Sequence, residues 1–89
     1  MATSYEITIS ESENQECYAE LPTVSGTVNF EFHIRRCFGN VFLSVYLDGE
    51  NIVASSSCLP GRYVFGYGGY ALYYIDDTHF EWRYYDLAR

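Results

Sequence analysis

Apolar and polar residues alternate most regularly over residues 28–34, which read Val-Asn-Phe-Glu-Phe-His-Ile. Successive side chains of a strand point to opposite faces of a sheet, so this pattern predicts a strand with one buried and one solvated face. Residues 5–9, Tyr-Glu-Ile-Thr-Ile, alternate in the same way and predict the first strand. Residues 41–47, Val-Phe-Leu-Ser-Val-Tyr-Leu, are apolar at nearly every position, which is typical of a central strand. The first half of the chain is therefore predicted to contain at least three strands.

Turn residues join these segments into hairpins. Asp48-Gly49 lies between two strand-like runs and is the strongest hairpin signal, because this dipeptide readily adopts positive φ angles. Phe38-Gly39-Asn40 and Pro60-Gly61 also carry turn residues. The further strands that we expect cover residues 52–54, 62–67 and 70–75, while residues 80–85 form a final strand or an extended tail.

Two polar segments predict loops. Residues 10–16, Ser-Glu-Ser-Glu-Asn-Gln-Glu, indicate a solvated acidic loop, and residues 55–61 a serine-rich loop that ends in Pro-Gly. No 11-residue window has a convincing helical period. The expected fold is all-β, a small antiparallel barrel or sandwich of about six or seven short strands joined by hairpins. With 89 residues the chain forms one domain, 1–89, with an extended C-terminal segment from about residue 80 as an alternative to a last strand.

Composition and charge narrow the function. Aromatic residues make up 19% of the chain, which suits a pleated, half-buried surface. The net charge is −7, and all five basic residues are arginines. Non-specific binding to nucleic acid or to an anionic membrane needs a surplus of positive charge, so we expect neither partner. The N-terminal residues lack the pattern of a secretory signal, and no stretch is long and apolar enough to span a membrane.

The three cysteines, Cys17, Cys37 and Cys58, are about 20 residues apart and form no metal-binding motif. An odd number cannot pair completely within one chain. We expect reduced thiols and a reducing compartment, with a zinc site or a disulfide as the alternative.

Candidate chemistry is sparse. Asp76, Asp77, His79 and Glu81 lie within six residues, and alternate members would share one face of a strand. They could bind a metal or form an acid–base pair, but a turn with solvated carboxylates is the commoner meaning of such a cluster. His33 falls on the predicted polar face and is interpreted as an ordinary exposed histidine. We expect no catalytic residue, no metal and no cofactor.

Two further motifs are better explained by structure than by catalysis or ligand binding. Residues 55–58, Ser-Ser-Ser-Cys, lack the Gly-x-Ser-x-Gly turn that presents a nucleophile. Residues 66–70, Gly-Tyr-Gly-Gly-Tyr, resemble a phosphate-binding loop, but a strand and not a helix is expected to follow. The residues predicted to set loop geometry are Asp48, Gly49, Gly66, Gly68 and Gly69.

Tyrosines are the strongest functional clue. Ten tyrosines occur in the chain, and a domain this small cannot bury them all. Tyrosine and arginine are enriched at protein interfaces and lysine is depleted there, so we expect a subunit of an assembly. The residues predicted to form the interface are Tyr67, Tyr70, Tyr73, Tyr74, Phe80, Trp82, Tyr84 and Tyr85.

The order of these motifs resembles the baseplate plug family of contractile-tailed bacteriophages, a hub-associated family typified in cyanophage baseplates. The matching features are the alternating strand at 5–9, Gln15 and Tyr18, the strands at 30–34 and 41–47, the hairpin at 48–52, the loop at 59–61, the glycine-rich strand entry at 66–73, the acidic turn at 76–77 and the closing residues 85–87. The resemblance implies a structural virion subunit at the hub of the tail baseplate, assembled in the bacterial host cytoplasm. Its implied partners are tube, hub, spike or wedge proteins, in multiple copies.

Two other functions remain open from the sequence. A small acidic inhibitor that mimics nucleic acid would carry its carboxylates on one face, at a phosphate-like spacing. A carbohydrate-binding module would use Tyr73, Trp82 or Tyr84 as the platform on which a sugar stacks.

Overall fold

The computed structural model describes residues 4–10 and 14–84, and within these residues every regular element is a β-strand. The strands are β1 (Ser4–Thr8), β2 (Asn14–Thr23), β3 (Gly26–Cys37), β4 (Asn40–Leu47), β5 (Glu50–Cys58), β6 (Arg62–Tyr67), β7 (Tyr70–Asp76) and β8 (His79–Tyr84). The prediction of an all-β fold is confirmed, with eight strands where six or seven were expected.

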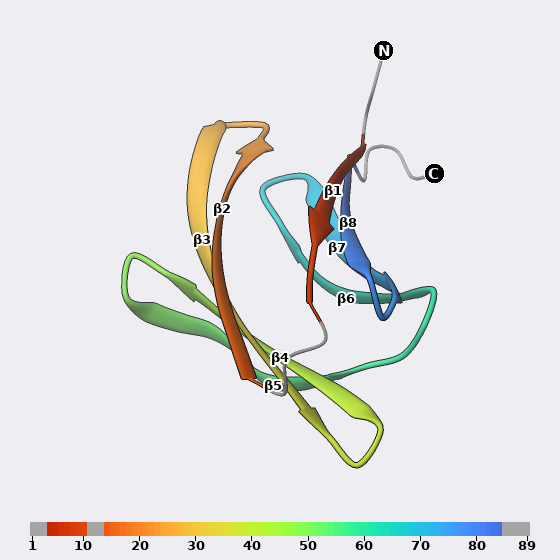
Figure 1. Ribbon diagram of the computed structural model, residues 1–89. Helices are drawn as coiled ribbons and strands as arrows, with labels where there is room; N and C mark the ends of the chain where they lie inside the picture. The colour runs from red at the N-terminus through yellow and green to blue at the C-terminus, as the bar shows by residue number, and fades with distance from the viewer. Residues whose placement is uncertain (1–3, 11–13, 85–89) are drawn as a thin grey trace.

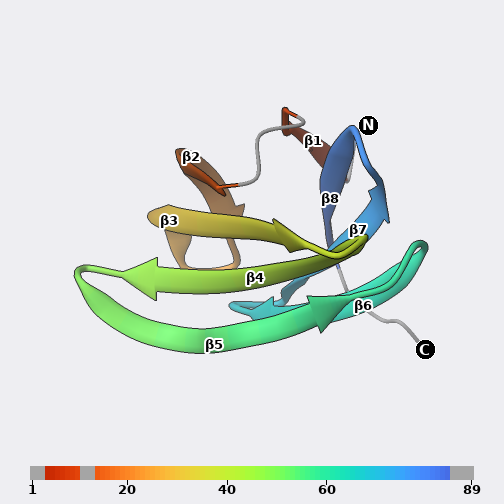
Figure 2. The ribbon, with the colours of Figure 1, turned by 60° about the horizontal axis from the view of Figure 1, so that its bottom comes forward.

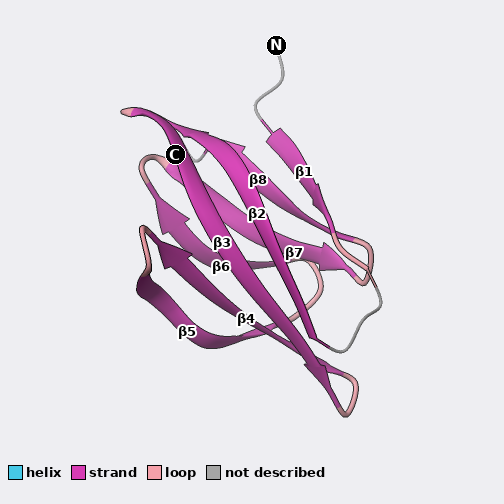
Figure 3. Cartoon of the chain, turned by 60° about the vertical axis from the view of Figure 1, so that its left-hand side comes forward, coloured by secondary structure: helices cyan, strands magenta, loops and turns pink. Residues whose placement is uncertain are grey.

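The strands form two antiparallel sheets that pack face to face as a sandwich (Figures 1 and 2). The first sheet has the order β1-β8-β7-β6, and the second has the order β2-β3-β4-β5. In the described chain the two sheets do not close into a barrel, which decides between the two predicted architectures. The connections from β2 to β8 are turns and short links at both ends of the strands (Figure 3).

The core lies between the sheets and is built from the inward-facing residues of both. In β3, Phe30, Phe32 and Ile34 are buried, while the residues between them face outward. The Phe30 ring meets Trp82 of the opposite sheet at a centroid distance of 5.3 Å, and Phe65 at 6.1 Å. Period-two alternation thus directs the aromatic side chains of both sheets into one interior.

Two predicted loops are strands in part, and for those parts the predictions are wrong. Residues 11–13 lie outside the described residues, and residues 59–61 form a link between β5 and β6, as predicted. β2 begins at Asn14, inside the segment expected to be a solvated loop, and pairs with β3 along its whole length. β5 runs through the three serines to Cys58, and Ser55 has a positive φ of 45°. The register of β5 against β4 shifts twice, between Leu43 and Val45 and between Val45 and Tyr46. A β-bulge of this kind allows a strand to continue through residues that do not alternate regularly.

Three hairpins have two-residue turns in which both central residues adopt positive φ. The φ angles are 52° and 79° at Phe38-Gly39, 54° and 81° at Asp48-Gly49, and 58° and 84° at Gly68-Gly69. Positive φ at both positions is the signature of the type I′ turn, whose twist matches that of the flanking strands. The first two turns therefore have nearly the same backbone but different first residues.

The β2–β3 turn docks against the β6–β7 turn and holds the two sheets together at one end. The amide of Val24 donates to the carbonyl of Gly68 at 2.9 Å, and Trp82 Nε1 donates to the carbonyl of Pro22 at 2.8 Å. A Cβ atom on Gly68 would lie 2.6 Å from the Cβ of Thr23. Glycine is required here both for the turn and for this close approach.

Candidate functional site

Three of the aromatic residues predicted to form an interface are part of the core. Trp82 is 0% exposed, and Tyr74 and Phe80 are also buried. The prediction that these three rings lie on the surface is wrong, because alternation along β7 and β8 points them between the sheets. Eight strands enclose more interior than the sequence suggested. Trp82 therefore offers no platform on which a sugar could stack.

The other predicted rings lie at or near the surface. Tyr67 and Tyr84 are exposed, and Tyr70 is half-buried with its ring stacked on Trp82 at 5.7 Å. Tyr73 is half-buried on the outer face of the first sheet, where the Arg83 guanidinium covers its ring at 4.4 Å. Tyr85 lies outside the described residues. The Tyr70 ring also contacts the Tyr84 ring, with their centroids 5.2 Å apart.

The predicted loop residues occupy turn positions, with one exception. Asp48 and Gly49 form the β4–β5 turn, and Gly68 and Gly69 form the β6–β7 turn. Gly66 lies within β6 and not in a turn. A Cβ atom on Gly66 would lie 3.1 Å from the Tyr63 hydroxyl oxygen, so the absence of a side chain leaves space for the Tyr63 phenol.

The most exposed large apolar residue of the described chain is Phe38, at the tip of the β3–β4 hairpin. Its side chain is 98% exposed, and its φ of 52° is a conformation that Asn, Asp or Gly adopts far more readily than Phe. Leu59 lies at the same end of the second sheet, because it follows Cys58, which pairs with Val41. The Leu59 residue is 56% exposed. The sequence did suggest a turn at this position, but it did not indicate that an apolar ring would project from it.

The base of this hairpin is held firmly by Arg36. One guanidinium nitrogen, Nη2, donates to the carbonyl of Ser10 at 2.7 Å and to the carbonyl of Asp77 at 2.9 Å. The other, Nη1, lies 3.6 Å from Asp77 Oδ1. Arg36 thereby ties β3 to the link after β1 and to the β7–β8 turn, so the Phe38 ring projects from a fixed support.

The cluster proposed from sequence around His79 does not converge on one point. His79 Nδ1 lies 3.4 Å from Asp76 Oδ1, whereas Nε2 on the other side of the ring lies 3.7 Å from Glu81 Oε2. Asp77 points elsewhere and accepts a hydrogen bond from the Tyr74 hydroxyl at 3.0 Å. Hydrogen bonds from Thr78 lower the pKa of the Asp76 carboxyl, as expected for a carboxylate that organises a turn.

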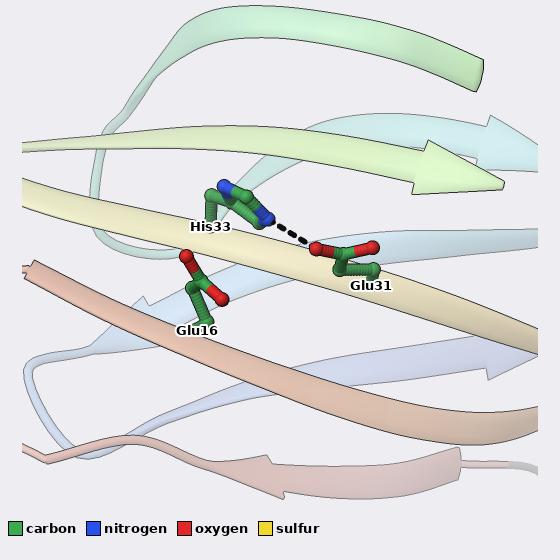
Figure 4. A group of neighbouring side chains, drawn as sticks. All are labelled: Glu16, Glu31 and His33. Atoms are coloured by element: carbon green, nitrogen blue, oxygen red, sulfur yellow. Dashed lines mark hydrogen bonds and ion pairs between the residues drawn. The ribbon is translucent and has the colours of Figure 1, made fainter. Parts of the chain in front are cut away.

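Convergence occurs instead at His33, on the outer face of the second sheet (Figure 4). His33 Nε2 lies 2.6 Å from Glu31 Oε2, and Glu16 approaches the pair from β2. One potential ligand atom from each residue lies within 4.8 Å of the other two. The sequence interpretation of His33 as an ordinary exposed histidine missed this cluster, because Glu16 is opposite His33 only in a strand that was expected to be a loop.

This cluster lies beside a surface hollow, and its two carboxylates affect a neighbouring hydroxyl group. A surface hollow of about 350 Å³ borders it, with Glu16, His33, Ser44 and Ser55 among its lining residues. The His33 ring packs against Tyr46 at a centroid distance of 4.7 Å. The negative charges of Glu31 and Glu16 raise the pKa of the neighbouring Tyr18 hydroxyl, with Glu31 the larger influence.

All three cysteines are free thiols. Cys17 and Cys37 are half-buried, and Cys58 is buried in the core, where loss of hydration raises its pKa to about 11. A thiol in this environment stays protonated and is a poor nucleophile and metal ligand.

Comparison with known proteins identifies no relative: no family model, no curated protein and no solved structure matches this chain. The described residues include no helix that is long and apolar enough to cross a membrane.

Proposed function

We propose that this chain is an architectural subunit that acts through protein–protein contacts, and that the assembly is the baseplate of a contractile phage tail. The observation that carries the contact function is Phe38, an apolar ring held almost wholly in solvent on a turn that disfavours it. Its conformation costs roughly 1–2 kcal/mol relative to a residue suited to positive φ. The isolated domain gains no burial in return, so the benefit of this ring lies in a partner.

A protein is the partner that fits this tip best. An aromatic side chain that fills a pocket is the usual centre of a protein interface, and arginine often accompanies it. Arg35 and Arg62, both exposed, lie near the Phe38 turn and the Leu59 link, respectively. The net charge of −7 opposes binding to an anionic membrane. We therefore expect a partner with an apolar pocket bordered by acceptor groups.

Docking by addition of a strand is less favoured, because the edges of the second sheet are protected. The edge strand β2 carries Glu16 and Glu20 on its outward side and Pro22 near its end. At the other edge, β5 is interrupted by the bulge at Ser55. Charge, proline and bulges are the usual means by which natural sheets prevent pairing between edges.

The assignment to a phage tail rests on the resemblance of the chain's motifs to the baseplate plug family. A hub subunit of this kind works by contacts with tube, spike or wedge proteins and is assembled in the host cytoplasm. The proposal is compatible with an all-β domain that has a rigid, projecting anchor.

The test uses purified virions of the phage that encodes the chain. Mass spectrometry of the virions should detect the chain in several copies, and an epitope tag on it should be seen at the baseplate end of the tail. Absence of the chain from purified virions would overturn the phage assignment.

A second arm tests the anchor. Virions that encode Phe38→Asn should incorporate at least tenfold less of the chain, whereas the matched turn variant Asp48→Asn should be incorporated normally. Equal incorporation of Phe38→Asn and the wild-type chain would show that the anchor lies elsewhere.

A further inference from the structure

We propose that Glu16, Glu31 and His33 form a binding site for a divalent transition-metal ion of the Zn²⁺ type. The site lies on the outer face of the second sheet and is independent of the phage assignment and of the Phe38 anchor. The cluster combines two carboxylates with an imidazole. Zn²⁺ binds both types of ligand, and sites with three protein ligands leave a coordination position open.

The strand geometry brings the three side chains together. Glu31 and His33 are two residues apart in β3, so they point to the same face. Glu16 of β2 is directly opposite His33 in the antiparallel register. Side chains in that relation have Cβ atoms about 4.5–5.5 Å apart, which is a separation that one ion can bridge.

The distances require only a small adjustment. Ligands bind Zn²⁺ at about 2.0–2.2 Å, which places neighbouring ligand atoms in a tetrahedral site about 3.3 Å apart. The separation between His33 Nε2 and Glu31 Oε2 is 2.6 Å, and all three atoms lie within 4.8 Å of one another. The hydrogen bond now joining His33 and Glu31 would open slightly, and Glu16 would move inward by rotation of an exposed side chain (Figure 4).

The charge of the site favours a cation. Two carboxylates, Glu16 and Glu31, face a single imidazole. Arg35 is also a lining residue of the adjoining hollow, but no ion pair within 4.0 Å joins it to Glu16 or Glu31 in the described chain. A divalent ion would neutralise both carboxylates at once.

The hollow beside the cluster leaves space for the remaining coordination positions. Its volume of about 350 Å³ accommodates several water molecules, and Ser44 and Ser55 are among its lining residues. The Tyr46 ring supports the imidazole from one side. The His79 cluster lacks this arrangement, because its carboxylates contact opposite nitrogens of the ring.

The experiment titrates the full-length chain with Co²⁺ and Zn²⁺ under reducing conditions. Calorimetry should show one ion per chain for each metal, and the Co²⁺ spectrum should indicate nitrogen and oxygen ligands without a thiolate charge-transfer band. His33→Ala should weaken binding by about tenfold or more, and Glu16→Gln and Glu31→Gln should each weaken it also. The matched controls His79→Ala and Glu20→Gln should bind as the wild-type chain does.

Three results would overturn the site. They are no binding of either ion at millimolar concentration, equal binding by His33→Ala and the wild-type chain, or a thiolate band in the Co²⁺ spectrum. Circular dichroism of each variant without metal verifies that it is folded. If His33→Ala does not fold, broadening of the His33 ring signals by Co²⁺ in the NMR spectrum of the wild-type chain, with the His79 signals unchanged, decides the question.

Discussion

Replacement of Phe38 by Asn should stabilise the isolated chain. The side chain is 98% exposed, so its removal sacrifices almost no buried area. The φ of 52° at this position costs an ordinary L-residue roughly 1–2 kcal/mol, and Asn tolerates the conformation much better. We expect the free energy of unfolding to rise by about 1 kcal/mol, which corresponds to about 4–8 °C in Tm for a domain of this size.

The β4–β5 turn supplies a matched control within the same molecule. Asp48 has a φ of 54° and is followed by a glycine, as Phe38 is, so the two turns share one backbone geometry. Asp48→Phe should lower the free energy of unfolding by about 1 kcal/mol, the reverse of Phe38→Asn. The pair of variants separates the effect of the turn from any general effect of surface hydrophobicity.

Urea unfolding monitored by tryptophan fluorescence measures both changes. Trp82 is the only tryptophan and is 0% exposed, so its emission reports loss of the core. With an m value of about 2 kcal/mol/M, Phe38→Asn should raise the midpoint by about 0.5 M. A Phe38→Asn chain that is less stable than the wild type would refute the reasoning, since the ring would then stabilise the isolated fold.

Three further predictions concern the interior. Gly68→Ala should lower the free energy of unfolding in urea by about 2 kcal/mol, because the added methyl group would clash with Thr23 and the residue must keep a positive φ. An unchanged free energy of unfolding would contradict the docking of the two turns. Trp82→Phe should lower the free energy of unfolding by about 3 kcal/mol, because packing and the hydrogen bond to the Pro22 carbonyl are lost. Unfolding monitored by circular dichroism measures this change, and a decrease below about 1 kcal/mol would contradict the central place of Trp82 in the core. Burial raises the pKa of Tyr74 from 10.0 to about 12, and the hydrogen bond to the Asp77 carboxylate adds to the effect. The protonated phenol therefore stabilises the fold fully below pH 10, and this stability is lost as the pH rises toward 12. Urea unfolding between pH 9 and pH 12 should show a smaller decline for Tyr74→Phe than for the wild type, and an equal decline would contradict this linkage.

The sequence predicted the strands whose inward residues are strongly apolar. Alternation over residues 28–34 and the Asp48-Gly49 turn are local signals, and both correspond to elements of the structure. β2 was missed because its inward residues before Leu21 are Gln15, Cys17 and Ala19, which are polar or small and give a weak hydrophobic signal. Pairing with the long strand β3 stabilises β2, and pairing between distant segments leaves no local pattern.

The functional surfaces were harder to predict for the same reason. Composition indicated correctly that some tyrosines are exposed, but only the two-sheet arrangement determines which ones are. Alternation placed Trp82 on one face of β8 without revealing that this face is the interior. The Glu16–His33 neighbourhood depends on register between two strands, so no spacing along the chain could have indicated it.

The claim that Phe38 anchors this chain to a partner is tested most directly by photo-crosslinking in the assembled particle. A photoreactive benzophenone amino acid in place of Phe38 should yield one major crosslinked product with a single neighbouring protein, while the same group in place of Asp48 should yield little. Strong crosslinking from position 48 and none from position 38 would contradict the account.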